Sequence, residues 1–255
     1  MVSFYDQLIE GIDGYILVED AEEELCELYS VYYSKDSNDR LDLVEPRKPE
    51  VDIEIEGGKR PISLTISQNI NINGEPGQTG AVLWNSSIVM GEFFARSTPH
   101  WDLSALTALE LGSGCGLVGL TLHRLGMQRT ILTDQLRMMR LLTKNMDANR
   151  LKSSSLEMFA TEYVWGQMPE DQRIVRQSID MVVASDCVYH ESVAPMLVHT
   201  LVDVCKCVGM VGQELRSDLV HQVFLAELLK HFVVYRVPVS PKIDGFYALY
   251  AIWLK

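Results

Sequence analysis

The chain lacks the features that mark membrane and secreted proteins. No apolar run approaches the roughly 20 residues that a membrane-spanning helix needs. The opening segment carries Asp6 and Glu10, where a secretory signal has a basic start and an apolar centre. We therefore expect a soluble intracellular protein with no membrane partner, located in the cytoplasm with the nucleus as a second location.

Cysteines are few, and their spacing does not predict a metal site. The chain has five, an odd number, and only Cys205 and Cys207 lie close together. No histidine-pair motif accompanies them, as a zinc site of that kind would need. We expect reduced thiols that pack as small apolar side chains, and no bound metal.

Basic side chains are fewer than acidic ones. The chain has 22 basic and 35 acidic side chains, which gives a net charge of −13. A surface that grips nucleic-acid phosphates needs the opposite excess, so we expect no direct nucleic-acid binding. The acidic balance suits a basic partner, although a need for solubility explains it at least as well.

Length and patterning predict an N-terminal extension followed by one domain. The 255 residues lie near the upper limit for a single core. Residues 1–75 contain an acidic amphipathic helix at 19–34, a polar linker with two prolines, and alternating apolar and polar residues on either side of Gly57 and Gly58. That alternation predicts an antiparallel hairpin. The domain is expected over residues 76–255.

From residue 106 onwards, short apolar strands alternate with helical periodicity. The strand segments are, in order, LTALEL, RTILTD, LEMFATEYVW, IDMVVASDCVY, CVGMVGQEL, VVYRVPV and FYALYAIWL. This alternation predicts an α/β fold with a mostly parallel seven-stranded sheet and helices on both faces. The short connection SPKIDG joins antiparallel neighbours, so the last strand is expected to be antiparallel.

A glycine-rich segment, LELGSGCGLVGL at residues 109–120, leads from the first of these strands into a helix. The backbone of such a turn comes close to a ligand. Acidic residues also lie at the ends of three strands, namely Glu110, Asp134 and Asp186. Strand ends line the ligand crevice of an open α/β sheet, and Asp134 is placed to accept hydrogen bonds from both hydroxyls of a ribose. The sequence therefore predicts a cofactor that contains a nucleoside.

Two nucleoside cofactors compete for this loop. Residues 114–119 fit the dinucleotide pattern G-x-G-x-x-G, but that pattern begins two residues too late after the strand. From the strand end, the motif is instead Glu110 followed by glycines at 112, 114 and 116. A carboxylate repels a pyrophosphate but can hold a cation, and S-adenosyl-L-methionine carries an ammonium and a sulfonium. Electrostatics therefore favours the methyl donor.

Several separated segments carry a family resemblance. They are, in order, TGAVLWNSSIVM, LELGSGCGLVGL, EYVWG, ASDCVYHESVAPML and GQELRSDLVHQVFL. The fourth holds an Asp-x-x-Tyr signature as Asp186 and Tyr189. Over residues 62–255 the chain resembles the seven-β-strand protein methyltransferases of family 16, which include lysine methyltransferases of chaperones, elongation factors and ribosomal proteins. The resemblance implies a Rossmann-like methyltransferase that uses S-adenosyl-L-methionine and acts on a lysine side chain of a protein.

The resemblance also implies contacts with the cofactor. They are Trp84 against the bound cofactor, Gly112, Ser113 and Gly114 at its methionine portion, Asp134 at the ribose hydroxyls, Trp165 beside the adenine, and Ser185 after the fourth strand. Each assignment has a structural alternative. The tryptophans could be core residues, the glycines could serve only a tight turn, and Asp134 could cap the following helix.

Methyl transfer from a sulfonium is an in-line displacement, so catalysis depends mainly on alignment and on a neutral amine. Lysine has a solution pKa of about 10.4, so the site must favour loss of its proton. We expect Asp186 to orient the incoming amine and Tyr189 to shape the pocket. His190 is adjacent, but a lone histidine in this position is expected at the surface.

Two other functions stay open at this level. The glycine loop does not specify a protein acceptor, so a small-molecule methyltransferase is one alternative. The other is a non-catalytic adaptor that keeps the fold and uses the acidic N-terminal region as its contact surface. The presence of both Asp134 and Asp186 argues against the adaptor. A monomer is expected by default.

Overall fold

The computed structural model describes residues 14–35, 43–70, 81–151, 155–240 and 245–255. Asp6 and Glu10, part of the predicted polar linker and most of the SPKIDG connection lie outside these ranges.

The main sheet has eight strands in the order β1-β9-β10-β8-β7-β4-β5-β6. Their bounds are β1 (Ile16–Val18), β4 (Thr107–Leu111), β5 (Arg129–Asp134), β6 (Glu157–Glu162), β7 (Met181–Ser185), β8 (Val208–Glu214), β9 (Phe232–Val237) and β10 (Tyr247–Leu254). The run from β6 through β5, β4 and β7 to β8 is parallel, and β10 runs antiparallel to both β8 and β9. The seven strands predicted after residue 106 and the antiparallel last strand are confirmed.

The sheet is one strand larger than the sequence predicts. β1 pairs antiparallel with β9 and extends the sheet at that edge. Three residues are too few to show a strand period, so the sequence gives no usable signal for β1. The N-terminal extension therefore contributes to the same sheet as the predicted domain.

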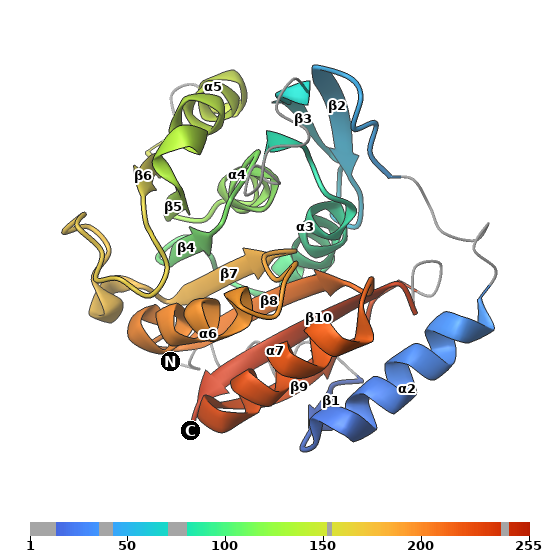
Figure 1. Cartoon of the computed structure of the whole chain (residues 1–255). Helices are drawn as coiled ribbons and strands as arrows, with labels where there is room; N and C mark the ends of the chain where they lie inside the picture. The colour runs from blue at the N-terminus through green and yellow to red at the C-terminus, as the bar shows by residue number, and fades with distance from the viewer. Residues whose placement is uncertain (1–13, 36–42, 71–80, 152–154, 241–244) are drawn as a thin grey trace.

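Helices cover both faces of the sheet, as predicted (Figure 1). They are α2 (Ala21–Ser34), α3 (Asn85–Ser97), α4 (Leu117–Arg124), α5 (Met139–Asn149), α6 (Val193–Val204) and α7 (Asp218–His231), with short 3-10 turns η4 (Thr98–His100), η5 (Leu136–Met138) and η6 (Arg176–Ser178). α2, α6 and α7 share one buried apolar cluster with the sheet, and α3, α4 and α5 pack on the opposite face. Within the described ranges, no helix has the length and apolar character that a bilayer crossing requires.

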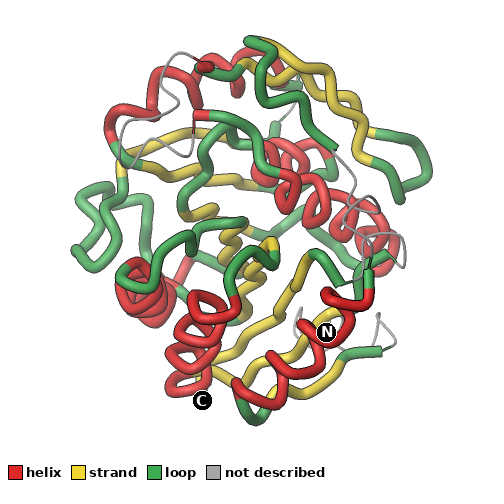
Figure 2. The backbone as a smooth tube through the Cα atoms, turned by 45° about the vertical axis from the view of Figure 1, so that its right-hand side comes forward, coloured by secondary structure: helices red, strands yellow, loops and turns green. Residues whose placement is uncertain are grey.

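The predicted hairpin is confirmed as a separate two-stranded sheet of β2 (Glu50–Ile55) and β3 (Ile62–Ser67), seen apart from the main sheet in Figure 2. Its alternate apolar residues are buried against α3, α4 and α5. Asn145 and Asn149 of α5 each exchange two hydrogen bonds with the backbone of β3, at Ser67 and Thr65 respectively. These amides satisfy backbone groups that an open strand edge would leave unpaired.

The predicted acidic helix is confirmed as α2, and it packs on the main sheet beside α7. The Asp20 side chain accepts hydrogen bonds from the amides of Glu22 and Glu23 and so caps its first turn. Glu24 is buried, with Tyr250 of β10 donating to its Oε1 and Arg236 of β9 within 3.4 Å of its Oε2. The extension is thus held to the sheet by polar as well as apolar contacts.

Candidate functional site

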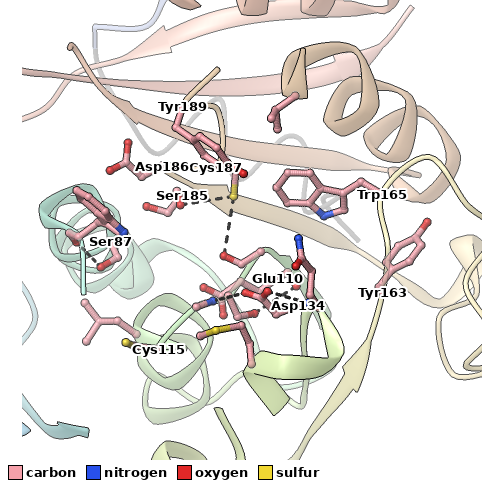
Figure 3. Close-up of a pocket in the computed structure, with 18 of the residues that line it drawn as sticks. Ser87, Glu110, Cys115, Asp134, Tyr163, Trp165, Ser185, Asp186, Cys187 and Tyr189 are labelled. Carbon is pink, nitrogen blue, oxygen red and sulfur yellow. Dashed lines mark hydrogen bonds between the residues drawn. The ribbon is translucent and has the colours of Figure 1, made fainter. Parts of the chain in front are cut away.

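The candidate site is a cleft at the carboxyl ends of β4, β5 and β7, bordered by the N-terminus of α3 (Figure 3). All of the candidate residues from the sequence line it: Trp84, Glu110, Gly112, Ser113, Gly114, Asp134, Trp165, Ser185, Asp186 and Tyr189. The sheet therefore brings these ten residues together in one cleft. The parallel strands explain this, because their carboxyl ends meet at one edge of the sheet.

The glycine loop after β4 needs a backbone that other residues adopt rarely. Gly112, Gly114 and Gly116 have φ values of 62°, 54° and 86°. A Cβ on Gly112 would lie 2.8 Å from Trp165 Cζ2 and 2.9 Å from Cys187 Sγ, so Gly112 is also required by close packing. Positive φ and this close packing both require glycine here, and a role of the loop in cofactor binding stays a prediction.

Ser113 fixes this loop to the neighbouring strand. Its amide donates to the Thr133 carbonyl at 2.9 Å, and its Oγ accepts from the Thr133 amide at 3.0 Å. Asp134, the last residue of β5, makes the next link. Its Oδ2 accepts from the Gly114 amide at 2.7 Å and its Oδ1 accepts from the Gln135 amide at 2.7 Å. The carboxylate is thereby oriented at the cleft wall.

Asp134 does not cap α5. Gln135 precedes η5, and the N-cap position of α5 is Met138, so the capping alternative for Asp134 fails. Burial raises the pKa of Asp134, while the hydrogen bonds from Gly114 and Gln135 and the charge of Arg137 oppose that rise. The group is therefore a hydrogen-bond acceptor in a largely buried position.

Glu110 differs from what its sequence position suggests. Its side chain is buried, and its Oε2 accepts from the amide of Gly119 in the first turn of α4 at 3.0 Å. Burial raises the pKa of Glu110 to about 8, and the charge of Asp134 adds to the rise. The carboxyl group is therefore mostly protonated at neutral pH, and the charge invoked to repel a pyrophosphate is largely absent.

Gly119, the third glycine of the formal dinucleotide pattern, is explained by the same contact. A Cβ there would lie 2.6 Å from Glu110 Oε2 and 2.8 Å from Leu132 Cγ. The N-cap residue of α4 is Gly116, which has no side chain to accept a hydrogen bond from the helix. Glu110 supplies that acceptor from the preceding strand.

The two tryptophans occupy different environments. Trp84 sits at the N-cap position of α3 and is 37% exposed, so it is not a core tryptophan. Trp165 is half-buried and contacts Gly112. It also packs against the buried apolar cluster that α2, α6 and α7 share with the sheet. Ser185 ends β7, and its Oγ lies 3.1 Å from the Oγ of Ser86 in a hydrogen bond between β7 and α3.

Asp186 is held in an unusual conformation. It has a φ of 57°, and no other residue apart from glycine has a positive φ in the part of the chain that the structure describes. Its amide donates to the Gly212 carbonyl at 2.7 Å. Its side chain is 1% exposed and does not cap α6, whose N-cap is Ser192. Such backbone strain persists where the surroundings over-determine it, which is common at functional sites.

Asp186 pairs with Arg216, a residue that the sequence motifs do not identify. The Arg216 guanidinium donates to both carboxylate oxygens of Asp186 and to Glu214, and its central carbon lies 4.7 Å from the centre of the Trp84 ring. The available signal was the acid-x-base pattern Glu214-Leu215-Arg216 at the carboxyl end of a strand. The pattern does not show which acid Arg216 contacts, and only the pairing of β7 with β8 brings it to Asp186.

The outer rim of the cleft is apolar and partly exposed. Tyr189 is 48% exposed and Met196 46% exposed, and both line the cleft next to Val193. His190 is exposed, and its Nδ1 lies 2.9 Å from Ser192 Oγ. The predicted surface position of His190 is therefore confirmed.

The two halves of the cleft have different linings. One half offers the Asp134 carboxyl group beside Tyr163 and Trp165, and the glycine loop forms the floor. The other half offers Asp186 and Tyr189. Among the described residues, no three His, Cys, Asp or Glu side chains gather as metal ligands would.

Comparison with known proteins points to one family. Residues 63–228 match the family model described as lysine methyltransferase. The chain is 30% identical over 192 residues to protein-lysine N-methyltransferase EFM6 of Saccharomyces cerevisiae, covering 66% of this chain and 75% of the relative. It is 29% identical to protein N-lysine methyltransferase METTL21A of Mus musculus, covering 64% and 73%, and 27% identical to EEF1A lysine methyltransferase 3 of Xenopus tropicalis, covering 59% and 68%.

Proposed function

The chain belongs to the lysine methyltransferase family, and from that premise we propose how its cleft carries out the reaction. It is a protein-lysine N-methyltransferase whose methyl donor is S-adenosyl-L-methionine. We propose that donor and lysine meet in the cleft at the ends of β4, β5 and β7. The observation that carries this proposal is the convergence of all candidate residues on that single cleft.

In the proposed cofactor half, Asp134 accepts hydrogen bonds from the ribose hydroxyls. The Gly114 and Gln135 amides support this role because they fix the direction of its carboxylate. The backbone of Gly112, Ser113 and Gly114 approaches the methionine portion, with the protonated Glu110 carboxyl group behind the loop. Further contacts are assigned to Trp165 beside the adenine, Ser185 at the end of β7, and Trp84 at the α3 N-terminus.

In the proposed acceptor half, Asp186 orients the amine of the substrate lysine and Tyr189 shapes the entrance. Bound S-adenosyl-L-methionine supplies an electrophilic methyl group on its sulfonium. The protein's part is alignment and exclusion of water, which Trp84, Tyr189 and Met196 support by lining the cleft with apolar surface. The lysine gives up its proton to solvent, and partial burial in this rim favours its neutral form.

The acceptor is proposed to be a protein of the translation or chaperone machinery. One relative is named for EEF1A, and translation elongation factors are accordingly the first acceptors to test. The apolar rim around the cleft suits a macromolecular acceptor, since Tyr189 and Met196 are close to half exposed. We further propose that the protein acts as a monomer in the cytoplasm without binding nucleic acid. Light scattering should then give a mass near 28.8 kDa.

The decisive test is transfer of label from tritiated S-adenosyl-L-methionine into the proteins of a cell extract. Label in a protein band, recovered as methyllysine after hydrolysis, is the expected result. Label confined to small molecules would favour a small-molecule acceptor. Cofactor binding without any turnover would favour the non-catalytic adaptor.

A matched pair of variants tests the two halves of the cleft. Asp134→Ala is expected to weaken S-adenosyl-L-methionine binding at least about tenfold, because hydrogen bonds to a charged group are lost. Asp186→Asn is expected to lower methyl transfer about a hundredfold through misalignment while leaving cofactor binding nearly intact. Calorimetry measures the first effect and labelling the second. Unchanged affinity in Asp134→Ala, or equal losses of binding and transfer in Asp186→Asn, would refute the respective role.

A further inference from the structure

Asn145 of α5 joins two segments that are far apart in the sequence, the hairpin strand β3 and the glycine loop. Its Oδ1 accepts from the Ser67 amide at 2.8 Å, and its Nδ2 donates to the Ser67 carbonyl at 3.0 Å. The same Nδ2 donates to the Cys115 carbonyl at 2.9 Å. The side chain is fully buried, and both of its amide hydrogens are used in these bonds. Because only the nitrogen can donate, the partners also fix which way the amide faces.

The bond to Cys115 fixes a peptide unit within the glycine loop. The Gly116 amide belongs to the same planar unit as the Cys115 carbonyl, and it donates to the Ser113 carbonyl at 2.7 Å to close a turn. The unit is therefore held from both sides, by Asn145 and by the loop itself. Leu142, one turn before Asn145 on α5, packs against Gly116, since a Cβ on that glycine would lie 2.7 Å from Leu142 Cδ1. The helix α5 thus supports the turn at the floor of the cleft.

Asn149 provides an internal comparison on the same helix. Its side chain exchanges the same pair of hydrogen bonds with β3, in this case at Thr65, with distances of 2.9 Å and 2.8 Å. Its third hydrogen bond goes to the backbone carbonyl of Asn145 at 2.8 Å and so stays within α5. The two asparagines therefore hold the hairpin in the same way, and of the two Asn145 alone contacts the glycine loop.

We propose that Asn145 is a positioning residue for the cofactor, which fixes the glycine loop and makes the β2–β3 hairpin a support of the cofactor site. This inference rests on the proposed binding of S-adenosyl-L-methionine at that loop. Asn145 does not line the cleft, so it acts through the Cys115 carbonyl. Loss of this contact should weaken cofactor binding. By thermodynamic reciprocity, cofactor binding should in turn strengthen the attachment of β3.

Asn145→Ala and Asn149→Ala form a matched pair of variants. Each removes three side-chain hydrogen bonds, two of them to β3, so the Tm values of the two variants should agree within about 4 °C. Calorimetry with S-adenosyl-L-methionine should separate them. The Kd is expected to rise at least about tenfold in Asn145→Ala and less than about threefold in Asn149→Ala. A role limited to stability would lower both Tm values and leave the two affinities alike.

Kinetics should show the same separation. The initial rate of label transfer from tritiated S-adenosyl-L-methionine into extract proteins is measured over a range of cofactor concentrations. In Asn145→Ala the KM for the cofactor should rise about tenfold, while the rate at saturating cofactor should stay within about threefold of the wild-type rate. The reason is that the acceptor half of the cleft keeps its contacts, so only cofactor binding is weakened.

Amide hydrogen exchange gives a readout that does not depend on activity. In the wild type, saturating cofactor should slow exchange of the Thr65 and Ser67 amides of β3 several-fold, because β3 and the loop share Asn145. The reference is β1, at the opposite edge of the sheet, where exchange should change less than about twofold. In Asn145→Ala the Thr65 amide keeps its acceptor on Asn149, but its slowing by saturating cofactor should disappear.

Equal cofactor affinities in the two alanine variants would overturn the inference, as would β3 amides in the wild type whose exchange does not respond to the cofactor. If Asn145→Ala does not fold, the exchange measurement on the wild type decides alone. Failure of the proposed function alone looks different, because the wild type would then bind the cofactor without transferring label to protein while the two variants still differ in affinity. A wild type that binds no cofactor would overturn both.

Discussion

At the scale of single residues, Glu110 illustrates how burial changes the chemistry of an acid. Its carboxyl group completes the first turn of α4 from outside the helix, and burial raises its pKa to about 8. A glutamate in the unfolded chain has a pKa of about 4.3 and is ionised at neutral pH, so Glu110 takes up a proton when the chain folds. The contribution of Glu110 to the stability of the fold therefore decreases as the pH rises.

Glu110→Gln tests this protonation. Because the folded pKa lies above the unfolded one, protonated Glu110 stabilises the fold below about pH 4 and that contribution is lost as the pH rises through about 8. Glutamine still accepts the hydrogen bond from Gly119 and does not ionise. The Tm of the variant should gain on the wild type between about pH 5 and about pH 8, followed by circular dichroism. A constant difference in Tm across this range would contradict the protonated state.

Gly112 and Gly126 allow steric crowding to be separated from backbone strain. Both have positive φ, of 62° and 99°, but a Cβ on Gly126 would meet nothing within 4 Å, whereas Gly112 faces Trp165 and Cys187. Alanine at either position carries the left-handed strain of about 1 to 2 kcal/mol. Only Gly112→Ala should also deform the floor of the cleft.

We therefore expect Gly112→Ala to weaken S-adenosyl-L-methionine binding at least about tenfold, while Gly126→Ala lowers stability with its cofactor affinity unchanged. Calorimetry and thermal denaturation measure the two effects. Similar affinities in both variants would show that the loop tolerates the crowding.

At the scale of elements, α2 shows how an extension becomes part of the fold. Tyr250 of β10 is fully buried, and its hydroxyl group donates to Glu24 of α2 at 3.2 Å and lies 2.8 Å from His221 Nε2 of α7. Arg236 bridges Glu24 and Glu27. One hydroxyl thus links two helices and a strand, in a place where an unpaired polar group would be costly.

Tyr250→Phe should destabilise the protein by about 1 to 3 kcal/mol, because it leaves buried partners without a hydrogen bond. Tyr29→Phe is the matched control on α2, since the buried Tyr29 hydroxyl has no hydrogen-bond partner among the residues that the structure describes. That change should alter stability by less than about 0.5 kcal/mol. Urea denaturation compares the two, and equal losses would argue that the Tyr250 network contributes nothing specific.

At the scale of the whole molecule, charge is the dominant property. The net charge of −13 favours approach of a basic acceptor and becomes screened as salt rises. The labelling rate at fixed extract should fall several-fold between about 50 mM and about 300 mM salt, whereas cofactor affinity should change much less. Equal salt dependence of the two would show that the surface charge does not steer the acceptor.

Local signals in the sequence predicted the strands after residue 106, the hairpin and the acidic helix, because hydrophobic period is readable within a few residues. Glycine spacing and strand-end acids selected the glycine loop, Glu110, Asp134 and Asp186, and the parallel sheet brings these strand ends to one edge. Trp84, Trp165, Ser185 and Tyr189 were implied only by the family resemblance.

The pairing of β1 with β9, the raised pKa of Glu110 and the contact between Arg216 and Asp186 are visible only in the folded structure. The first depends on a strand too short to show a period. The second depends on burial, which is a property of the folded neighbourhood rather than of the residue. The third joins residues 30 positions apart, which the pairing of β7 with β8 brings together.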